Sequence, residues 1–199
     1  MKPSIAFFDF DGTITRKDTM FEFIRFVYGS GRLYAGMLKV SPWLIAMKAG
    51  IVSAHTAKEK LLAAFFKGMA LETFNKHAKS FADKILPNLL RPSALRELET
   101  HQENGVTVAV VSASAENWVK DFCDSRNVVC IATKLELDAE NKLTGKLSGA
   151  NCNSAEKVSR IKCEFDPADY EVIYAYGDSN GDKEMLAIAT HPHYRYFTD

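Results

Sequence analysis

The sequence contains no run of lysine or arginine and no excess of charge of either sign. Its 199 residues include 25 basic and 25 acidic side chains, so the formal net charge is zero. A protein that binds nucleic acid through the phosphate backbone needs a basic patch or stripe. The composition therefore argues against nucleic acid as a partner, and it favours a small-molecule substrate or a neutral surface.

The chain is also poor in cysteine and in targeting signals. The four cysteines, Cys123, Cys130, Cys152 and Cys163, form no CxxC pair and have no zinc-site spacing. The first residues, MKPSIAFF, lack the apolar segment and small-residue cleavage site of a secretory signal. We therefore expect free thiols in a reducing compartment, and a cytoplasmic protein.

No long hydrophobic run is free of both charge and proline. The stretch from Leu33 to Ser53 is the most apolar part of the chain, and Lys39, Pro42 and Lys48 interrupt it. A membrane-spanning helix needs about 20 nearly uncharged residues, so this stretch is not expected to span. Two interpretations stay open. The segment is either a helix buried in the core or in a dimer, or a helix of the cap that makes peripheral contact with a membrane surface.

The sequence does contain enough apolar residues for a core, and strands that alternate with helices. Hydrophobic residues make up 47% of the chain, which suits one large domain or a domain with an insertion. Strands are predicted at residues 5–10, 106–111, 128–131, 171–176 and 194–197, with helices between them and a hairpin through residues 138–145. This alternation predicts an α/β fold with a parallel sheet covered by helices on both faces.

Residues 18–86 differ from the rest because they contain helical patterns and no predicted strand. Capping-box patterns begin at Thr19 and at Thr56 and predict two helix starts. This block lies between the first strand and the remaining strands. We therefore predict a core of residues 1–17 plus 87–199, and an inserted all-helical cap of residues 18–86 that folds over the edge of the sheet as a lid.

Polar residues follow three of the predicted strands. The segment FFDFDGT contains Asp9 and Asp11, VTVAVVSAS contains Ser112, and VIYAYGDSNGD contains Asp178 and Asp182. In an open parallel sheet, ligands bind beyond the carboxyl ends of the strands. We therefore expect these side chains to meet at one edge of the sheet, together with Lys157 from an intervening helix.

This set of side chains suits phosphoryl transfer. Carboxylates that face one point repel one another, and a hard dication such as Mg²⁺ with oxygen ligands relieves the repulsion. A hydroxyl and an ammonium at the same point suit the oxygens of a phosphoryl group. Asp9 would attack phosphorus to give an aspartyl-phosphate. Asp11 would protonate the leaving oxygen and then activate water.

Each of these residues taken alone has a simpler interpretation. Asp11 followed by Gly12 is typical of a tight turn, Ser112 of a helix cap, and Lys157 of a solvated helix. The loop GDSNGDKEML has acidic residues spaced as in a calcium loop, but Lys183 and Ala189 stand where an EF-hand needs glycine and glutamate. The joint occurrence of the four segments in this order favours the phosphoryl-transfer interpretation.

The four segments, DFDGT, Ser112, Lys157 and GDSNGDKEML, resemble the four motifs of the haloacid dehalogenase (HAD) superfamily of phosphohydrolases. The helical insertion after the first motif, and the segment LELDAENKLTGKLSG, are similar to the phosphoserine phosphatase-like branch, subfamily IB. The resemblance covers the whole chain and implies a Rossmann-like core. It also implies roles for the site residues: Asp9 as nucleophile, Asp11 as general acid and base, Thr13 and Ser112 as phosphate hydrogen-bonders, Lys157 as phosphate clamp, and Asp9, the Asp11 carbonyl, Asp178 and Asp182 as the groups that hold or support Mg²⁺.

By this resemblance the protein is expected to be a Mg²⁺-dependent phosphoric monoester hydrolase, because a dehalogenase has no acid at the position of Asp11. Phosphoserine phosphatases typically carry serine after the second aspartate and a glutamate early in the cap, which holds the substrate amine. Here Gly12 and Asp18 occupy these positions. Asp18 either contacts the substrate in place of that glutamate or only favours the start of a helix.

We expect a small soluble phosphomonoester as the substrate. One alternative is a lipid head group such as phosphatidylglycerophosphate, because the apolar cap would accept acyl chains at the membrane surface. Another is a phospholigand-binding protein without turnover.

Overall fold

A five-stranded parallel sheet organises the computed structural model, which describes residues 2–199. Its strands are β1 (Ser4–Phe8), β2 (Thr107–Ala115), β3 (Val129–Thr133), β6 (Val172–Gly177) and β7 (His191–Tyr194), in the order β3-β2-β1-β6-β7. Ala6 in the middle strand lies beside Val108 of β2 and Tyr174 of β6. The strand β1 is apolar along its length because both of its faces are buried, as is typical of a central parallel strand.

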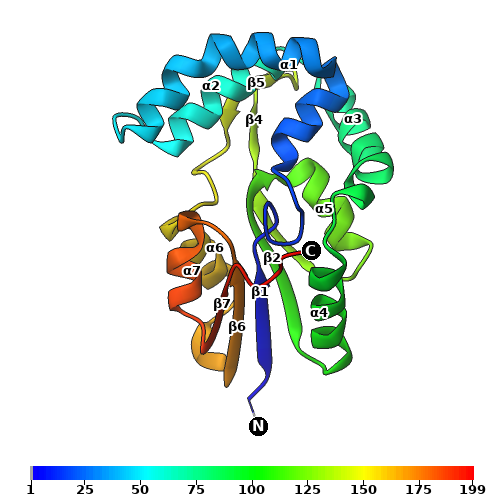
Figure 1. Cartoon of the computed structure of the whole chain (residues 1–199), viewed down its shortest axis with the longest axis vertical. Helices are drawn as coiled ribbons and strands as arrows, with labels where there is room; N and C mark the ends of the chain where they lie inside the picture. The colour runs from blue at the N-terminus through cyan, green and yellow to red at the C-terminus, as the bar shows by residue number, and fades with distance from the viewer. Residues whose placement is uncertain (1) are drawn as a thin grey trace.

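Helices cover both faces of this sheet (Figure 1). The helices α4 (Pro92–Glu103) and α5 (Glu116–Asp124) share a hydrophobic cluster with Ala6 and Phe8. The helices α6 (Ala155–Glu164) and α7 (Lys183–Ala187) share a second cluster with Ile5 and Phe7 on the opposite face. Three short 3₁₀ turns, η1 (Leu86–Asn88), η2 (Pro167–Asp169) and η3 (Asn180–Asp182), join these elements. The predicted Rossmann-like α/β architecture is confirmed.

Three more helices lie between β1 and β2 in the chain and gather beyond the carboxyl ends of the strands, at the top of Figure 1. They are α1 (Thr19–Lys48), α2 (Ala54–Phe66) and α3 (Leu71–Lys84). The first is interrupted at Gly29, where a φ of 78° and a ψ of 165° leave the helical region. The predicted hairpin is present as β4 (Leu135–Leu137) and β5 (Leu143–Leu147), and β5 packs against α2 rather than joining the main sheet.

The N-caps of two helices differ from Thr19 and Thr56, the residues at which the capping-box patterns begin. Asp18 is the N-cap of α1, since its Oδ1 accepts a hydrogen bond from the Met20 N–H at 2.9 Å. Ser53 is the N-cap of α2, and its Oγ accepts from the N–H of Thr56 at 3.1 Å. Thr19 is thereby free for another contact, which brings it into the site described below.

The ends of two strands also differ from the prediction. The strand β1 ends at Phe8, so Asp9 to Asp11 belong to the loop that follows it. The last strand begins at His191 rather than at Tyr194, because this segment pairs in register with β6, His191 beside Tyr174.

The chain passes twice between the sheet and the helical block, and the two crossings lie side by side. Thr15 and Leu90 form an antiparallel bridge. The Arg16 N–H donates to the Leu89 carbonyl and the Arg91 N–H donates to the Ile14 carbonyl, each at 2.8 Å. These contacts join residues 14–16 to residues 89–91. The division into core and cap stays a prediction.

Candidate active site

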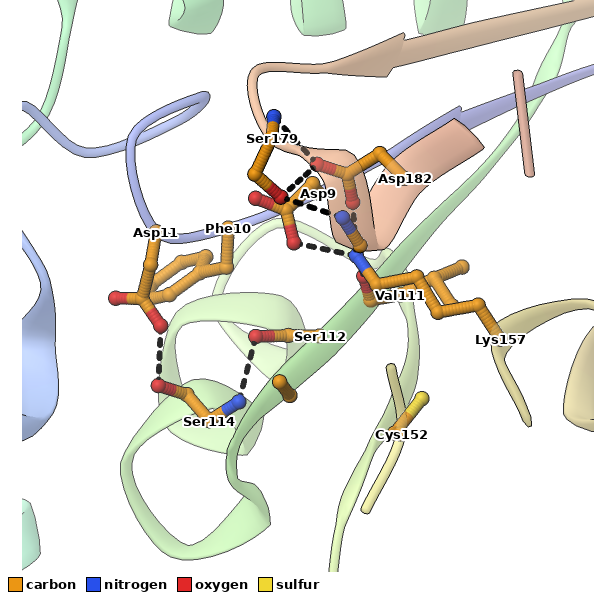
Figure 2. Close-up of polar contacts among 12 residues, drawn as sticks. Asp9, Phe10, Asp11, Val111, Ser112, Ser114, Cys152, Lys157, Ser179 and Asp182 are labelled. Carbon is orange, nitrogen blue, oxygen red and sulfur yellow. Dashed lines mark hydrogen bonds and ion pairs between the residues drawn. The ribbon is translucent and has the colours of Figure 1, made fainter. Parts of the chain in front are cut away.

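One lysine joins the ends of three strands of the sheet. Lys157, in the first turn of α6, is buried, and its Nζ donates to Asp9 Oδ1 at 2.5 Å and to Asp182 Oδ1 at 2.7 Å. The same ammonium donates to the Val111 carbonyl in β2 at 2.7 Å. Asp9 itself is fixed by a hydrogen bond of 2.9 Å from its N–H to the Tyr176 carbonyl of β6. Figure 2 shows this group of side chains, which the sequence predicted to meet.

The charges in this group perturb one another. Burial raises the pKa of Asp9 to about 7, although the neighbouring Lys157 pulls it down. Burial also disfavours the Lys157 ammonium, but Asp9 and Asp182 outweigh this effect and raise the pKa of Lys157. For Asp182, burial is likewise outweighed, and Lys157 with Ser179 holds the pKa of that carboxyl below its ordinary value. The site thus contains one cation between two carboxylates in a poorly solvated position, an arrangement typical of functional sites.

Carboxylate oxygens of Asp9, Asp178 and Asp182 lie within 4.8 Å of one another. Three convergent carboxylates with oxygen donors only are the ligand set that suits Mg²⁺, so the residues present fit this ion. The second carboxylate oxygen of Asp182 is also hydrogen-bonded. Oδ2 accepts from the Ser179 hydroxyl at 2.7 Å and from the Ser179 N–H at 3.0 Å. Of Asp178 and Asp182, Asp178 therefore has the carboxylate with fewer hydrogen bonds. A bound dication would lower the pKa of the carboxylates again.

Gly12 lies against this cluster. A Cβ at this position would lie 2.3 Å from Asp178 Oδ2, and the φ of Gly12 is +85°. A side chain here would therefore strain the backbone and force the Asp178 carboxylate to move. The sequence interpretation of Asp11 and Gly12 as a tight turn and their interpretation as part of a site are thus compatible, since the turn places Asp178 against the first motif.

The side chain of Asp11 points away from those of Asp9 and Asp182 (Figure 2). Its Oδ1 accepts from the N–H of Thr19 at 2.7 Å and from the Thr19 hydroxyl at 2.6 Å, and its Oδ2 accepts from the Ser114 hydroxyl. The side chain of Asp11 is therefore not part of the cluster, which leaves its carbonyl as the group proposed to face the ion. Both Asp9 and Asp11 line the same cavity. Sequence reasoning missed Thr19 and Ser114, because only the folded chain brings them to Asp11.

The two hydroxyls predicted to bind phosphate are both buried. Ser112 Oγ accepts from the N–H of Ser114 at 2.9 Å. Thr13 Oγ1 has no hydrogen-bond partner among residues 2–199. An unpaired buried hydroxyl is costly, so Thr13 has a free donor that a ligand would satisfy. Neither residue lines the cavity in this structure, and their contacts with phosphate stay predictions.

The cavity has a volume of about 580 Å³ and is lined by Asp9, Asp11 and Lys157 on one side and by residues of α1 and α2 on the other. Asp18 lines it while capping α1, and burial followed by the charge of Asp11 raises the pKa of Asp18 to about 6. Lys58 of α2 enters the same cavity, where its Nζ donates to the Ala113 carbonyl and, at 3.3 Å, to Asn151 Oδ1. Burial lowers the pKa of Lys58 against the attraction of Asp11 and Asp18.

Lys58 was not identified from the sequence, because a lysine in an amphipathic helix is usually solvated. The rest of the wall formed by the helical block is apolar and consists of Met20, Phe21, Leu44, Met47, Ala54, Ala57 and Leu61. The block therefore supplies the cavity with the Lys58 ammonium, the Asp18 carboxylate and an apolar surface, and Arg16 and Lys17, directly before α1, add two more cations to the lining.

Comparison with known proteins finds a family whose model matches most of the chain. The family model for haloacid dehalogenase-like hydrolases matches residues 6–187. Protein CicA of Caulobacter vibrioides is 35% identical over 199 residues, which covers 98% of this chain and 87% of that protein.

Among solved structures, a protein of unknown function from Bordetella pertussis Tohama I superimposes with a TM-score of 0.80 at 20% identity, over 96% of this chain and 88% of that one. A phosphoserine phosphatase bearing a phospho-aspartyl intermediate analogue has a TM-score of 0.62 at 20% identity, over 95% and 84% of the two chains. At these identities the solved structures establish a shared fold.

Proposed function

Because the chain belongs to the haloacid dehalogenase-like hydrolases, we propose that it is a Mg²⁺-dependent phosphatase that hydrolyses phosphomonoesters through an aspartyl-phosphate on Asp9. The contact between Lys157 and Asp9, with Asp182 on the other side of the ammonium, carries this proposal. A carboxylate nucleophile and a phosphate dianion repel each other, and a fixed cation beside the nucleophile reduces that repulsion.

In the first step, a carboxylate oxygen of Asp9 attacks phosphorus and the ester oxygen of the substrate leaves. Asp11 donates a proton to that oxygen, so the alcohol departs neutral. The Thr19 and Ser114 contacts fix the Asp11 carboxyl in one orientation. A general acid must be held in place in this way if it is to reach the leaving oxygen.

In the second step, Asp11 accepts a proton from water, and the water oxygen attacks the phosphorus of the aspartyl-phosphate. The bond from phosphorus to Asp9 breaks, inorganic phosphate leaves, and the Asp9 carboxylate is restored. Lys157 stays beside the phosphoryl oxygens in both steps and balances their charge. The hydroxyls of Thr13 and Ser112 are proposed to donate to the same oxygens.

Asp9, Asp178, the Asp11 carbonyl and, in support, Asp182 would hold Mg²⁺, which would supply further positive charge for the phosphoryl group. These ligands come from two strand ends that the sheet holds together.

The decisive experiment uses Asp9→Asn, with Asp169→Asn as the control at an exposed position away from the site. Wild type and control should release phosphate from a phosphomonoester in Mg²⁺, lose this activity in EDTA, and give an acid-stable phosphoryl adduct on the peptide containing Asp9 after rapid quench. The Asp9→Asn variant should fold and show neither turnover nor adduct. Turnover that persists in Asp9→Asn would refute the proposed nucleophile.

For the substrate, we propose a small soluble phosphomonoester handled by a cytoplasmic enzyme as the first candidate. The apolar part of the cavity wall, formed by residues of α1 and α2, favours a second candidate, a phosphorylated lipid head group at the membrane surface. Asp18 would be the group that binds a substrate amine, but its carboxylate is already engaged as a helix cap.

Rates with phosphoserine, sugar phosphates and short-chain phosphatidylglycerophosphate separate the two candidates. A preference in kcat/KM for the acylated substrate over its deacylated form would support the lipid. Equal rates, or a preference for phosphoserine, would support the soluble substrate.

A further inference from the structure

The second part of α1 exposes a hydrophobic face. Tyr34 is 67% exposed, Leu38 76% and Ile45 67%, and these side chains recur at helical spacing on one side of the helix. Ala35, Pro42 and Ala49 lie on the same side and are also exposed. Buried Leu33 and Val40 anchor the opposite side. We call the set Tyr34, Ala35, Leu38, Pro42, Ile45 and Ala49 the apolar face.

The second part of α1, which carries the apolar face, lies at the outer end of the molecule, along the top of Figure 1. A contiguous hydrophobic surface of this kind marks a contact site in a soluble domain. No helix among residues 2–199 is long and apolar enough to cross a bilayer, so any contact with lipid here has to be made by a helix lying along the surface.

The charged residues in the second part of α1, which carries the apolar face, are all basic. Residues 23–58 contain no aspartate or glutamate, although the whole chain has equal numbers of acidic and basic residues. Exposed Arg32, Lys39 and Lys48 lie on α1 beside the apolar face, and exposed Lys60 and Lys67 lie on or just after α2. None of these five cations forms an ion pair with a carboxylate in the described part of the chain.

We infer that the apolar face docks on an anionic membrane surface. A helix with exposed aliphatic and aromatic residues bordered by lysine and arginine lies in the plane of the lipid head groups, because apolar burial and attraction to anionic lipids act together. A second copy of this chain would bring the same unpaired cations against one another. Charge complementarity therefore favours lipid over a dimer.

The position of α1 connects this surface to the catalytic cavity. Leu44 and Met47, on the inner side of the helix, line the cavity, while Ile45 between them points outward. A helix with its side chains is about 10 Å across, so a docked bilayer would lie one helix diameter from the cavity. The docking inference does not depend on the proposed phosphatase chemistry, since binding can be measured without turnover.

The test is flotation of the full chain with vesicles of phosphatidylcholine alone and of phosphatidylcholine mixed with phosphatidylglycerol, neither of which contains a phosphomonoester. We expect binding to the anionic mixture, weaker binding to phosphatidylcholine, and release by high salt. The double variant Leu38→Ser/Ile45→Ser should lose about ten-fold or more in affinity. The double variant Lys39→Gln/Lys48→Gln should lose on the order of twenty-fold, because each lysine contributes about five-fold near an anionic surface.

The control variant is Tyr194→Ser/Tyr196→Ser, which removes two exposed large hydrophobic residues from the other end of the chain and should bind as the wild type does. Circular dichroism melts establish that each variant folds, and Asp9→Asn should bind like the wild type. Absence of wild-type binding to the anionic vesicles would overturn the inference. The inference would also be overturned if the wild type forms a dimer in solution that Leu38→Ser/Ile45→Ser dissociates and does not float with the vesicles.

Discussion

Replacing Lys157 by methionine tests whether this ammonium is the counter-ion of the site. The substitution keeps the volume and apolar stem of the side chain but removes three donated hydrogen bonds, two of them to Asp9 and Asp182. Both carboxylates are buried, and removing one partner of a buried ion pair typically costs about 3–5 kcal/mol of unfolding free energy. For a chain of this size that corresponds to a fall in melting temperature of about 10 °C. The measurement is a thermal melt in EDTA.

The loss should depend on pH, and its sign follows from the carboxylates. Lys157 lowers the pKa of Asp9, which burial raises to about 7 against an ordinary value of 3.8. In the wild type, Asp9 already keeps its proton to about pH 7, so its contribution to stability falls between pH 3.8 and 7. Without the ammonium, Asp9 keeps its proton to still higher pH and this fall continues. The gap in melting temperature between wild type and Lys157→Met should therefore widen above about pH 7. Mg²⁺ should raise the melting temperature of the variant more than that of the wild type.

The matched control is Lys162→Met, which removes an exposed lysine from the same helix and should change the melting temperature little. A fall of less than about 3 °C for Lys157→Met, with no dependence on pH, would show that Lys157 is not the counter-ion of the site, because removing a buried counter-ion costs more than this.

Three further variants test other parts of the molecule. Gly12→Ala should reduce both Mg²⁺ affinity and kcat by ten-fold or more, because a Cβ there collides with the Asp178 carboxylate, which is proposed to hold Mg²⁺. The control Gly105→Ala, also at positive φ but in open space, should reduce only stability. Equal activity of the two variants would contradict this prediction. Lys58→Met should raise KM by about ten-fold, the value of one charge-assisted hydrogen bond, whereas Lys60→Met should not; a change in kcat alone would instead make Lys58 a positioning residue. Burial lowers the pKa of His101, so its neutral ring contributes stability above pH 6.5 that is lost as pH falls below that value. The melting temperature of His101→Gln should therefore fall less steeply with decreasing pH than that of the wild type.

The sequence predicted part of the cluster at the strand ends, because the carboxyl ends of parallel strands share one edge of the sheet. Asp9, Lys157 and Asp182 come from distant parts of the chain and lie in contact as predicted. The strand limits were less exact, since apolar runs continue into the loops: Phe10 is fully buried although β1 ends at Phe8.

The helix starts show what local sequence patterns cannot predict. Asp18 and Thr19 are both good N-cap residues, and the local sequence does not choose between them. The choice follows from tertiary contacts: the Thr19 hydroxyl donates to Asp11 and accepts from Trp118 Nε1 at 3.0 Å, which leaves Asp18 to cap the helix. The same limit explains why Lys58 was missed, because its surroundings exist only when α2 lies over the sheet.

The helix α1 links features that otherwise lie in separate parts of the molecule. Its first residue, Thr19, gives two of the hydrogen bonds that orient Asp11, and its second part carries both a wall of the cavity and the apolar face. Its two parts meet at Gly29, where the backbone is not helical. Any displacement of the first part relative to the sheet removes the Thr19 donors from Asp11 and so changes the orientation of the proposed acid. The helical block therefore does more than form a wall of the cavity, because the Thr19 donors at the start of α1 hold Asp11.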